Sequence, residues 1–190
     1  MTGGALLVRD RLLDRLRSRW VAPVTVVRAS AGYGKTTLLT QARADNAAAP
    51  LGVEAWLQCS PGMAVVSSFG AALCDAVGAR RPGRGDPGDL ASAVVEALWR
   101  RSPQQLTLPV DDVHEIPPGS DAAALVAAIV AALPDNGHVV LSGRGSPPVP
   151  LGRLEVEGRV VVLAEEELAF TPAELVEFAE LRRVAGTRVA

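Results

Sequence analysis

The chain has 190 residues, of which 48% are apolar and 21% are charged, and its formal net charge is −2. This length and apolar content suit one α/β domain with a sizeable core, whereas a nucleic-acid-binding domain normally carries a basic excess. No apolar run approaches the roughly 18 residues of a membrane span, and the run over residues 5–8 is too short for a signal peptide, so a cytoplasmic protein without membrane contact is expected.

Apolar periodicity and turn-forming residues divide the chain into alternating helices and strands. In chain order they predict a helix over 9–20, a strand over 24–27, a helix over 36–44, a strand over 53–57, a helix over 65–78, a Gly/Pro/Arg loop over 79–89, a helix over 90–100, a strand over 106–110, a helix over 122–133 and strands over 138–141 and 160–163. Thr171 and Glu174 form a capping box that predicts a last helix. This alternation indicates a three-layer α/β sandwich with a five-stranded, mainly parallel sheet.

The segment Ala29–Thr36, ASAGYGKT, lies between the first predicted strand and the next helix. It matches the Walker A pattern of P-loop NTPases, except that Ala29 stands where the first glycine is usual. Two glycines let successive N–H groups point into one concavity that suits phosphate, and the following helix adds its positive N-terminal dipole. An ordinary glycine-rich turn is the alternative. The residues expected to bind nucleotide here are Ala29, Ser30, Ala31, Gly32, Tyr33, Gly34, Lys35, Thr36 and Thr37.

Two side chains of this segment have the chemistry that phosphate and magnesium require. Lys35 is the only lysine among 19 basic residues, which indicates a position that needs a compact ammonium group rather than a planar guanidinium. Lys35 is expected to contact the β- and γ-phosphates and to support catalysis, and the Thr36 hydroxyl is expected to bind Mg²⁺. The cofactors predicted are therefore ATP or ADP together with Mg²⁺.

The predicted strand over residues 106–110 ends in two acids, as a Walker B strand does. Asp111 would hold Mg²⁺ through water, and Asp112 would orient or polarise the attacking water. A pair of acids in a turn is the alternative. Pro109 lacks the N–H of an interior strand residue, so a local bulge or a weakened strand is expected, and this argues against efficient hydrolysis.

Three further residues outside these motifs have possible roles. Arg144 follows the predicted strand 138–141, where it is either a sensor of the γ-phosphate or a solvated loop residue. His114 lies close enough in sequence to neighbour the Walker B acids. Cys59 and Cys74 are expected to be buried, reduced thiols rather than a disulfide or a metal pair.

Taken together, the motifs resemble the NTPase domain of STAND-class proteins, in particular MalT-like large LuxR-family transcriptional regulators. The matching stretches are LLVRDRLLDRL, RASAGYGKTTLLTQ, EAWLQC, VDDVHEI, LSGRGSPPVPLGRL and LAFTPAEL, in the family's order and over nearly the whole chain. The resemblance implies an ATP-dependent switch, held off with ADP and turned on by inducer plus ATP. It also implies that the strand before Arg144 lies between the Walker A and Walker B strands, and that Val8 and Arg9 lie near the adenine.

The resemblance also sets the expected organisation of the chain. Residues 1–170 would form the P-loop NTPase core of AAA/STAND type, and residues 171–190 would begin a truncated helical lid. The family's inducer-sensing repeats and C-terminal helix-turn-helix have no counterpart in the sequence, so either a domain of a larger regulator or a truncated relative is expected.

Three functions follow from the motifs and the resemblance. The leading one is a Mg²⁺-dependent, ATP-binding regulatory module with slow hydrolysis, which works with regulator domains or an inducer-sensing partner and does not itself bind DNA. A degenerate nucleotide-binding interaction module without turnover is the alternative. A small-molecule kinase is a third, but the Asp111–Asp112 pair favours water activation.

Overall fold

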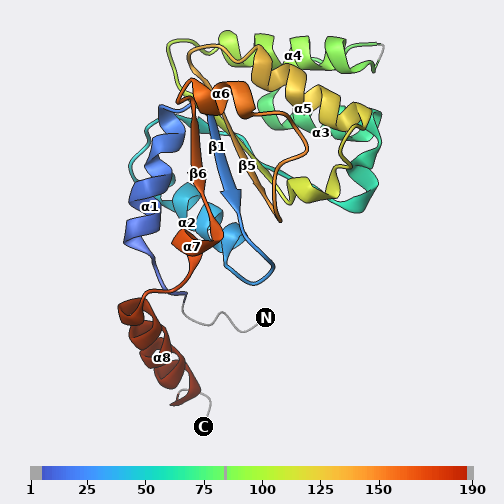
Figure 1. Ribbon diagram of the computed structural model, residues 1–190. Helices are drawn as coiled ribbons and strands as arrows, with labels where there is room; N and C mark the ends of the chain where they lie inside the picture. The colour runs from blue at the N-terminus through green and yellow to red at the C-terminus, as the bar shows by residue number, and fades with distance from the viewer. Residues whose placement is uncertain (1–5, 84, 188–190) are drawn as a thin grey trace.

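The computed structural model describes residues 6–83 and 85–187, and its centre is a parallel sheet (Figure 1). The strand order is β2–β4–β5–β1–β6, with β3 also beside β4, and every pairing is parallel. Six strands therefore occupy five positions, because β2 and β3 pair with successive parts of β4. The strands are β1 (Val24–Arg28), β2 (Val53–Glu54), β3 (Leu57–Gln58), β4 (Leu106–Asp111), β5 (Gly137–Gly143) and β6 (Val160–Leu163).

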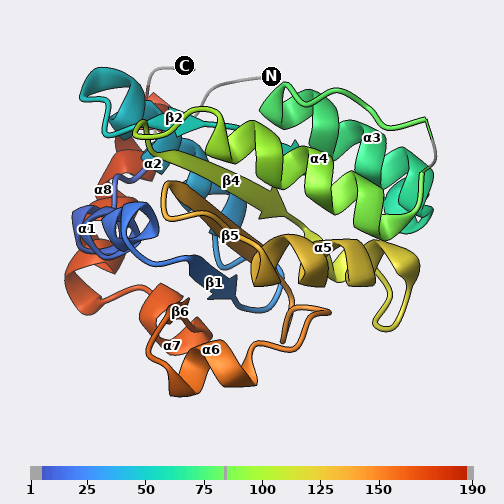
Figure 2. The same cartoon turned by 90° about the horizontal axis from the view of Figure 1, so that it is seen from above.

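Helices cover both faces of the sheet, which confirms the predicted three-layer α/β architecture. Figure 2 shows α3, α4 and α5 on one face and α1 and α2 on the other. The helices are α1 (Asp10–Leu16), α2 (Lys35–Ala48), α3 (Val66–Val77), α4 (Pro87–Trp99), α5 (Asp121–Ala131), α6 (Gly152–Val156), α7 (Glu165–Leu168) and α8 (Pro172–Thr187), with 3-10 turns η1 (Arg17–Trp20), η2 (Pro61–Ala64) and η3 (Val113–Glu115).

The alternation of side chains along the strands divides the apolar interior into two clusters. Val139 and Leu141 of β5 pack with α3, α4 and α5, whereas Val140 between them packs with α1 and α2. Successive strand residues point to opposite faces, so a strand with helices on both sides needs apolar residues throughout. This is why the central strands are continuous runs of valine and leucine.

The strand expected over residues 53–57 is instead two short strands, and the break lies opposite Pro109. The Thr107 and Asp111 carbonyls accept hydrogen bonds from Ala55 N at 3.0 Å and Cys59 N at 2.8 Å. Backbone groups of alternate strand residues point to the same side, so residue 109 also faces this neighbour and has no N–H to donate there.

Of the two outcomes expected at Pro109, a local bulge or a weakened strand, the bulge is wrong, because β4 is continuous through Pro109, which pairs with Val140. The interruption falls in the neighbouring edge strand instead. Asp111 consequently keeps its place at the end of a regular strand.

Several helix boundaries differ from the predictions. The helix expected over 9–20 is α1 followed by the 3-10 turn η1, and α2 runs four residues beyond the expected end, to Ala48. Helix α4 begins at Pro87 rather than residue 90, because the Asp86 carboxylate accepts the Asp89 N–H as an N-cap. The short helices α6 and α7 span too few residues to show a helical repeat in the sequence.

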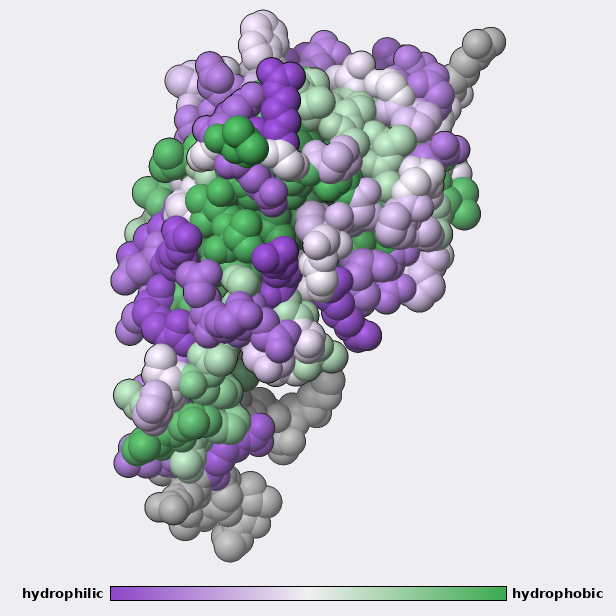
Figure 3. All heavy atoms as spheres, in the orientation of Figure 1, coloured by the Kyte–Doolittle hydropathy of each residue, from purple (hydrophilic) through white to green (hydrophobic). Residues whose placement is uncertain are grey.

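Helix α8 projects from the body of the protein (Figure 1). The Thr171–Glu174 capping box forms as predicted, with Glu174 N donating to Thr171 Oγ1 at 3.2 Å and Thr171 N donating to Glu174 Oε2 at 2.8 Å. Figure 3 shows apolar surface on α8, where Leu175 and Val176 are exposed. Within the described part of the chain, no helix has the length and hydropathy needed to cross a membrane.

Candidate functional site

The loop between β1 and α2 has the conformation expected of a phosphate-binding loop. Gly32 and Gly34 adopt positive φ values of 87° and 79°, which side chains rarely tolerate. No atom lies within 4 Å of a Cβ built at either position, so the glycines meet a backbone requirement and the loop opens toward free space. Gly34 is also the N-cap of the 14-residue α2, whose N-terminal N–H groups and dipole favour an anion.

Lys35 is the buried cation of this loop, with only 8% of its surface exposed. Its Nζ donates to the carbonyl oxygens of Ala29 at 2.8 Å and Ser30 at 3.0 Å. Across the described ranges Lys35 forms no ion pair within 4 Å, so the ammonium charge has only neutral acceptors. A buried cation without an anionic partner fits the phosphate role predicted for it.

Thr36 meets the Walker B strand directly. Its Oγ1 donates to Asp111 Oδ2 at 2.6 Å, although the two residues are 75 positions apart. Asp111 is fully buried at the end of β4, and its Oδ1 accepts the Asp112 N–H at 3.0 Å. A hydroxyl and a carboxylate oxygen are ligands that Mg²⁺ prefers, and Mg²⁺ usually completes its shell with water and phosphate oxygens.

Asp112 has a different environment from its neighbour. It adopts a left-handed backbone conformation with φ 54°, which aspartate tolerates better than most residues, directly after the end of β4. Gln58 Nε2 donates to Asp112 Oδ2 at 3.2 Å, and His114 Nδ1 lies 3.8 Å from Asp112 Oδ1. The predicted proximity of His114 is confirmed. Gln58 was missed. It is the last residue of β3 and pairs with Asp111, and its only signal in the sequence is its place directly after the predicted strand 53–57.

Arg144 follows β5, and β5 lies between β1 and β4 as the resemblance implied. Its side chain is exposed and has no hydrogen bond or ion pair to any residue that the structure describes. It lines a hollow of about 460 Å³ together with Arg28, Ser30, Ala31 and Glu165. Arg144 is therefore free to meet an anion on this side of the loop.

A second hollow, of about 730 Å³, lies on the other side of the loop. It is more apolar than the first and lies between the N-terminal segment, the loop, α2 and α8. Arg9 lines it, whereas the exposed Val8 does not. Its lining includes Leu6, Leu7, Ala31, Gly32, Tyr33, Gly34, Thr37, Leu38, Gln41, Leu168, Ala169, Phe170, Leu175, Phe178 and Arg182.

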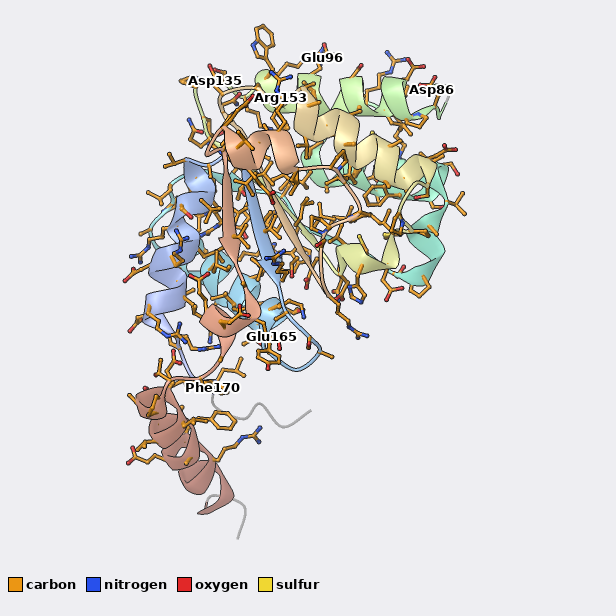
Figure 4. All side chains as sticks on the ribbon, in the orientation of Figure 1. Asp86, Glu96, Asp135, Arg153, Glu165 and Phe170 are labelled. Atoms are coloured by element: carbon orange, nitrogen blue, oxygen red, sulfur yellow. The ribbon has the colours of Figure 1, made fainter. Side chains whose placement is uncertain are left out.

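Two phenyl rings and two guanidinium groups are stacked along the wall of this second hollow. The Arg9 Cζ lies 4.6 Å from the Phe170 ring centroid, Phe170 stacks on Phe178 at 5.5 Å, and Arg182 Cζ lies 5.1 Å from the Phe178 centroid. Such cation–π and stacked pairs are attractive, and they present flat faces near the phosphate loop. Figure 4 shows Phe170 where the chain enters α8.

Glu174 fixes the start of α8 to the N-terminal segment. Its carboxylate pairs with Arg9 Nε at 3.1 Å and with Arg11 Nη2 at 2.9 Å. Partial burial opposes ionisation, but the two arginines and the Thr171 N–H outweigh it and lower the pKa of Glu174 to about 2. The wall of the second hollow is thus held by a charge cluster.

Glu165, the first residue of α7, contacts the phosphate loop and was not predicted. Its Oε2 accepts hydrogen bonds from Ser30 N and Ser30 Oγ, each at 2.7 Å. These bonds, with a contribution from the Tyr33 hydroxyl, lower the pKa of Glu165, and the same contact raises the pKa of Tyr33. Figure 4 shows Glu165 beside the loop that follows β1. Sequence reasoning missed it because α7 lies 135 residues from Ser30.

Comparison with known sequences connects the chain to one kind of transcriptional regulator. No protein-family model matches it. It is 28% identical over 191 residues to the HTH-type transcriptional regulator MalT of Serratia proteamaculans, covering 94% of this chain and 20% of MalT. It is 27% identical over 188 residues to MalT of Yersinia enterocolitica, covering 93% and 20%. The chain is a partial homologue of MalT and spans about a fifth of these relatives' length.

Solved structures with a similar fold are P-loop ATPases of the Cdc6/ORC and STAND kinds. Cdc6p from Pyrobaculum aerophilum has a TM-score of 0.63 at 16% identity, over 97% of this chain and 52% of that one. An ORC protein from Aeropyrum pernix, in complex with DNA, has a TM-score of 0.58 at 17% identity, over 95% and 50%. A STAND protein with a tetratricopeptide repeat sensor from Pyrococcus horikoshii has a TM-score of 0.51 at 18% identity, over 89% and 24%. These similarities confirm the predicted fold class.

Proposed function

We propose that this chain is the nucleotide-binding regulatory module of a MalT-like transcriptional regulator, which binds ATP or ADP with Mg²⁺ and hydrolyses ATP slowly. The observation that carries the proposal is the arrangement around α2. A buried lysine that forms no ion pair with any described residue lies next to a threonine whose hydroxyl contacts a buried strand-end aspartate. Phosphate and Mg²⁺ together would satisfy these groups.

The phosphates would occupy the concavity of the loop. Lys35 would exchange its two carbonyl partners for phosphate oxygens, and N–H groups of the loop and of α2 would add neutral donors. Thr36 and Asp111 would hold Mg²⁺, which supplies positive charge beside the phosphate oxygens. Thr37 lines the second hollow from the next helical position.

The base would lie in the second hollow, which is apolar and continuous with the loop. Arg9 and the ring of Phe170 form one wall, and Leu38 and Gln41 of α2 form another. A base stacks well against flat aromatic and guanidinium surfaces. In this arrangement Arg9 would lie near the adenine, as the resemblance implies, and residues 171–190 would begin a lid over the base, outside a core of residues 1–170.

We infer slow ATP hydrolysis from the two residues that would lie beside the bound phosphates. Asp112 would orient a water molecule, and Arg144 would approach the terminal phosphate from the first hollow. A module without turnover is the second candidate, because the Asp112 carboxylate already accepts a hydrogen bond from Gln58.

Calorimetry and a phosphate-release assay test the proposal and separate its two versions. The purified chain is titrated with ATP and with ADP, in the presence of Mg²⁺ and again with a chelator. We expect saturable binding of both nucleotides, strengthened by Mg²⁺ for ATP. Phosphate release without an added acceptor supports the slow ATPase, and tight binding without release supports the non-hydrolysing module. Absence of nucleotide binding would refute both.

A further inference from the structure

A glutamate of the protein itself, Glu165, is hydrogen-bonded to the phosphate loop on the side of the first hollow. Ser30 donates both its N–H and its hydroxyl to Glu165 Oε2, each at 2.7 Å. Among the residues that the structure describes, no other carboxylate is hydrogen-bonded to loop positions 29–34, and this one comes from α7, next to the loop in Figure 1. The loop therefore already has one anion bonded to it.

The Glu165 carboxylate is ionised at neutral pH. Hydrogen bonds from Ser30 lower its pKa, and the positive charge of Lys35 acts in the same direction. Lys35 is the residue proposed to contact the phosphates, so Glu165 lies within the electrostatic field of the same ammonium group. A negative charge at this place acts on any phosphate that Lys35 binds.

Glu165 lies on the side of the loop from which the terminal phosphate is proposed to be contacted. Arg144, proposed to approach that phosphate, lines the same hollow of about 460 Å³ as Glu165. ATP carries one more phosphate and more negative charge than ADP. Repulsion from a fixed carboxylate on this side therefore opposes the triphosphate more than the diphosphate.

We propose that Glu165 is a specificity-determining residue of the nucleotide site, which lowers the affinity for ATP relative to ADP through its fixed negative charge. The inference rests on the proposed binding of nucleotide at the loop. A role limited to holding the loop would change the affinities for ATP and ADP together, because both nucleotides use the loop. A role through charge changes the ratio of the two affinities, and this difference makes the proposal testable.

The test is the substitution Glu165→Gln, with ATP and ADP affinities measured by calorimetry in Mg²⁺-containing buffer. Glutamine keeps the length and an acceptor oxygen for Ser30 but removes the charge. We expect the ratio of ATP affinity to ADP affinity to rise by about three- to fivefold, since solvent weakens the repulsion at this partly exposed position. The shift should shrink as salt is raised.

Glu166→Gln is the matched control, because Glu166 lines the same hollow one residue away but has no hydrogen bond to the loop. It should leave the ratio within about twofold of the parent, because Glu166 is exposed and water screens its charge. An unchanged ratio in Glu165→Gln, an equal change in both affinities, or an equal shift in the control would each overturn the inference. If the parent chain binds neither nucleotide, the proposed function fails instead.

Discussion

At the scale of single residues, the two acids at the end of β4 differ in backbone conformation and in partners. Asp111 ends the strand, is fully buried and contacts Thr36, whereas Asp112 turns into a left-handed conformation and contacts Gln58 and His114. A carboxylate beside the Thr36 hydroxyl suits a metal ion, and a partly exposed carboxylate suits water. We therefore propose that these adjacent aspartates have two roles, Asp111 in holding Mg²⁺ and Asp112 in orienting water.

The substitution Asp112→Asn separates the proposed binding of Mg²⁺ from the proposed orientation of water. The amide keeps the size and hydrogen bonding of the carboxylate but removes the charge proposed to orient water. We expect ATP affinity to stay within about twofold and phosphate release to fall by about a hundredfold. Single-turnover phosphate release and calorimetry measure the two effects.

Asp135→Asn is the control for this substitution, because Asp135 is exposed at the opposite end of the molecule from Glu165 (Figure 4). It should match the parent in both assays. Unchanged turnover in Asp112→Asn would remove Asp112 from the mechanism.

The residues of the site differ in how well the sequence predicts them. Lys35, Thr36 and Asp111 follow from local motifs, and the structure brings all three together. Glu165 and Gln58 do not, because their contacts depend on how distant segments pack, and neither residue belongs to a pattern with a chemical meaning. A contact between residues more than a hundred positions apart, such as that between Ser30 and Glu165, can be recognised only from the tertiary structure.

At the scale of elements, the type of each central strand and long helix follows from apolar periodicity, and the errors have local causes. The missing N–H of Pro109 affects the neighbouring edge strand rather than β4 itself. Continuous β4 keeps Asp111 at the end of a regular strand, so Pro109 does not displace this acid.

The ion pairs of Glu174 attach α8 to the N-terminal segment and should contribute to stability. Glu174→Gln weakens the contacts with Arg9 and Arg11, so the free energy of unfolding at pH 7 should fall by roughly 1 kcal/mol. The folded-state pKa of Glu174, about 2, lies below its ordinary value of 4.5. The stabilisation is therefore complete above about pH 4.5 and is lost as the pH falls toward 2.

Urea unfolding at pH 7 and at pH 3 measures this difference between parent and variant. Glu177→Gln, on an exposed position of the same helix, serves as the control and should match the parent. A difference that is constant from pH 7 to pH 3 would contradict the assignment to the Glu174 charge.

At the scale of the whole molecule, the strand order places the ends of β1, β4 and β5 side by side, and the site lies at this edge. Helical periodicity predicts layers but no strand order. The position of β5 between β1 and β4 followed from the resemblance alone, and the structure confirms it.

Recognition of DNA is a prediction about the whole chain. One similar structure is of an ORC protein in complex with DNA, and this chain covers 50% of that protein. The net charge of −2 provides no basic excess for phosphate contacts, so we predict no sequence-specific DNA binding by this chain. Fluorescence anisotropy with duplex DNA at physiological salt should show none, and sequence-dependent nanomolar binding would contradict the prediction.

Lys35 is the side chain proposed to contact the phosphates, and its removal tests nucleotide binding at the loop most directly. Calorimetry should show that the parent binds ATP and ADP and that Lys35→Ala binds both at least about tenfold more weakly, because a charge-assisted contact to phosphate is lost. Arg43→Ala removes an exposed cation from the same helix, about 12 Å along its axis, and should bind as the parent does. Both variants should unfold at the parent's temperature without nucleotide. Binding of ATP by Lys35→Ala as tightly as by the parent would contradict the assignment of the phosphate site.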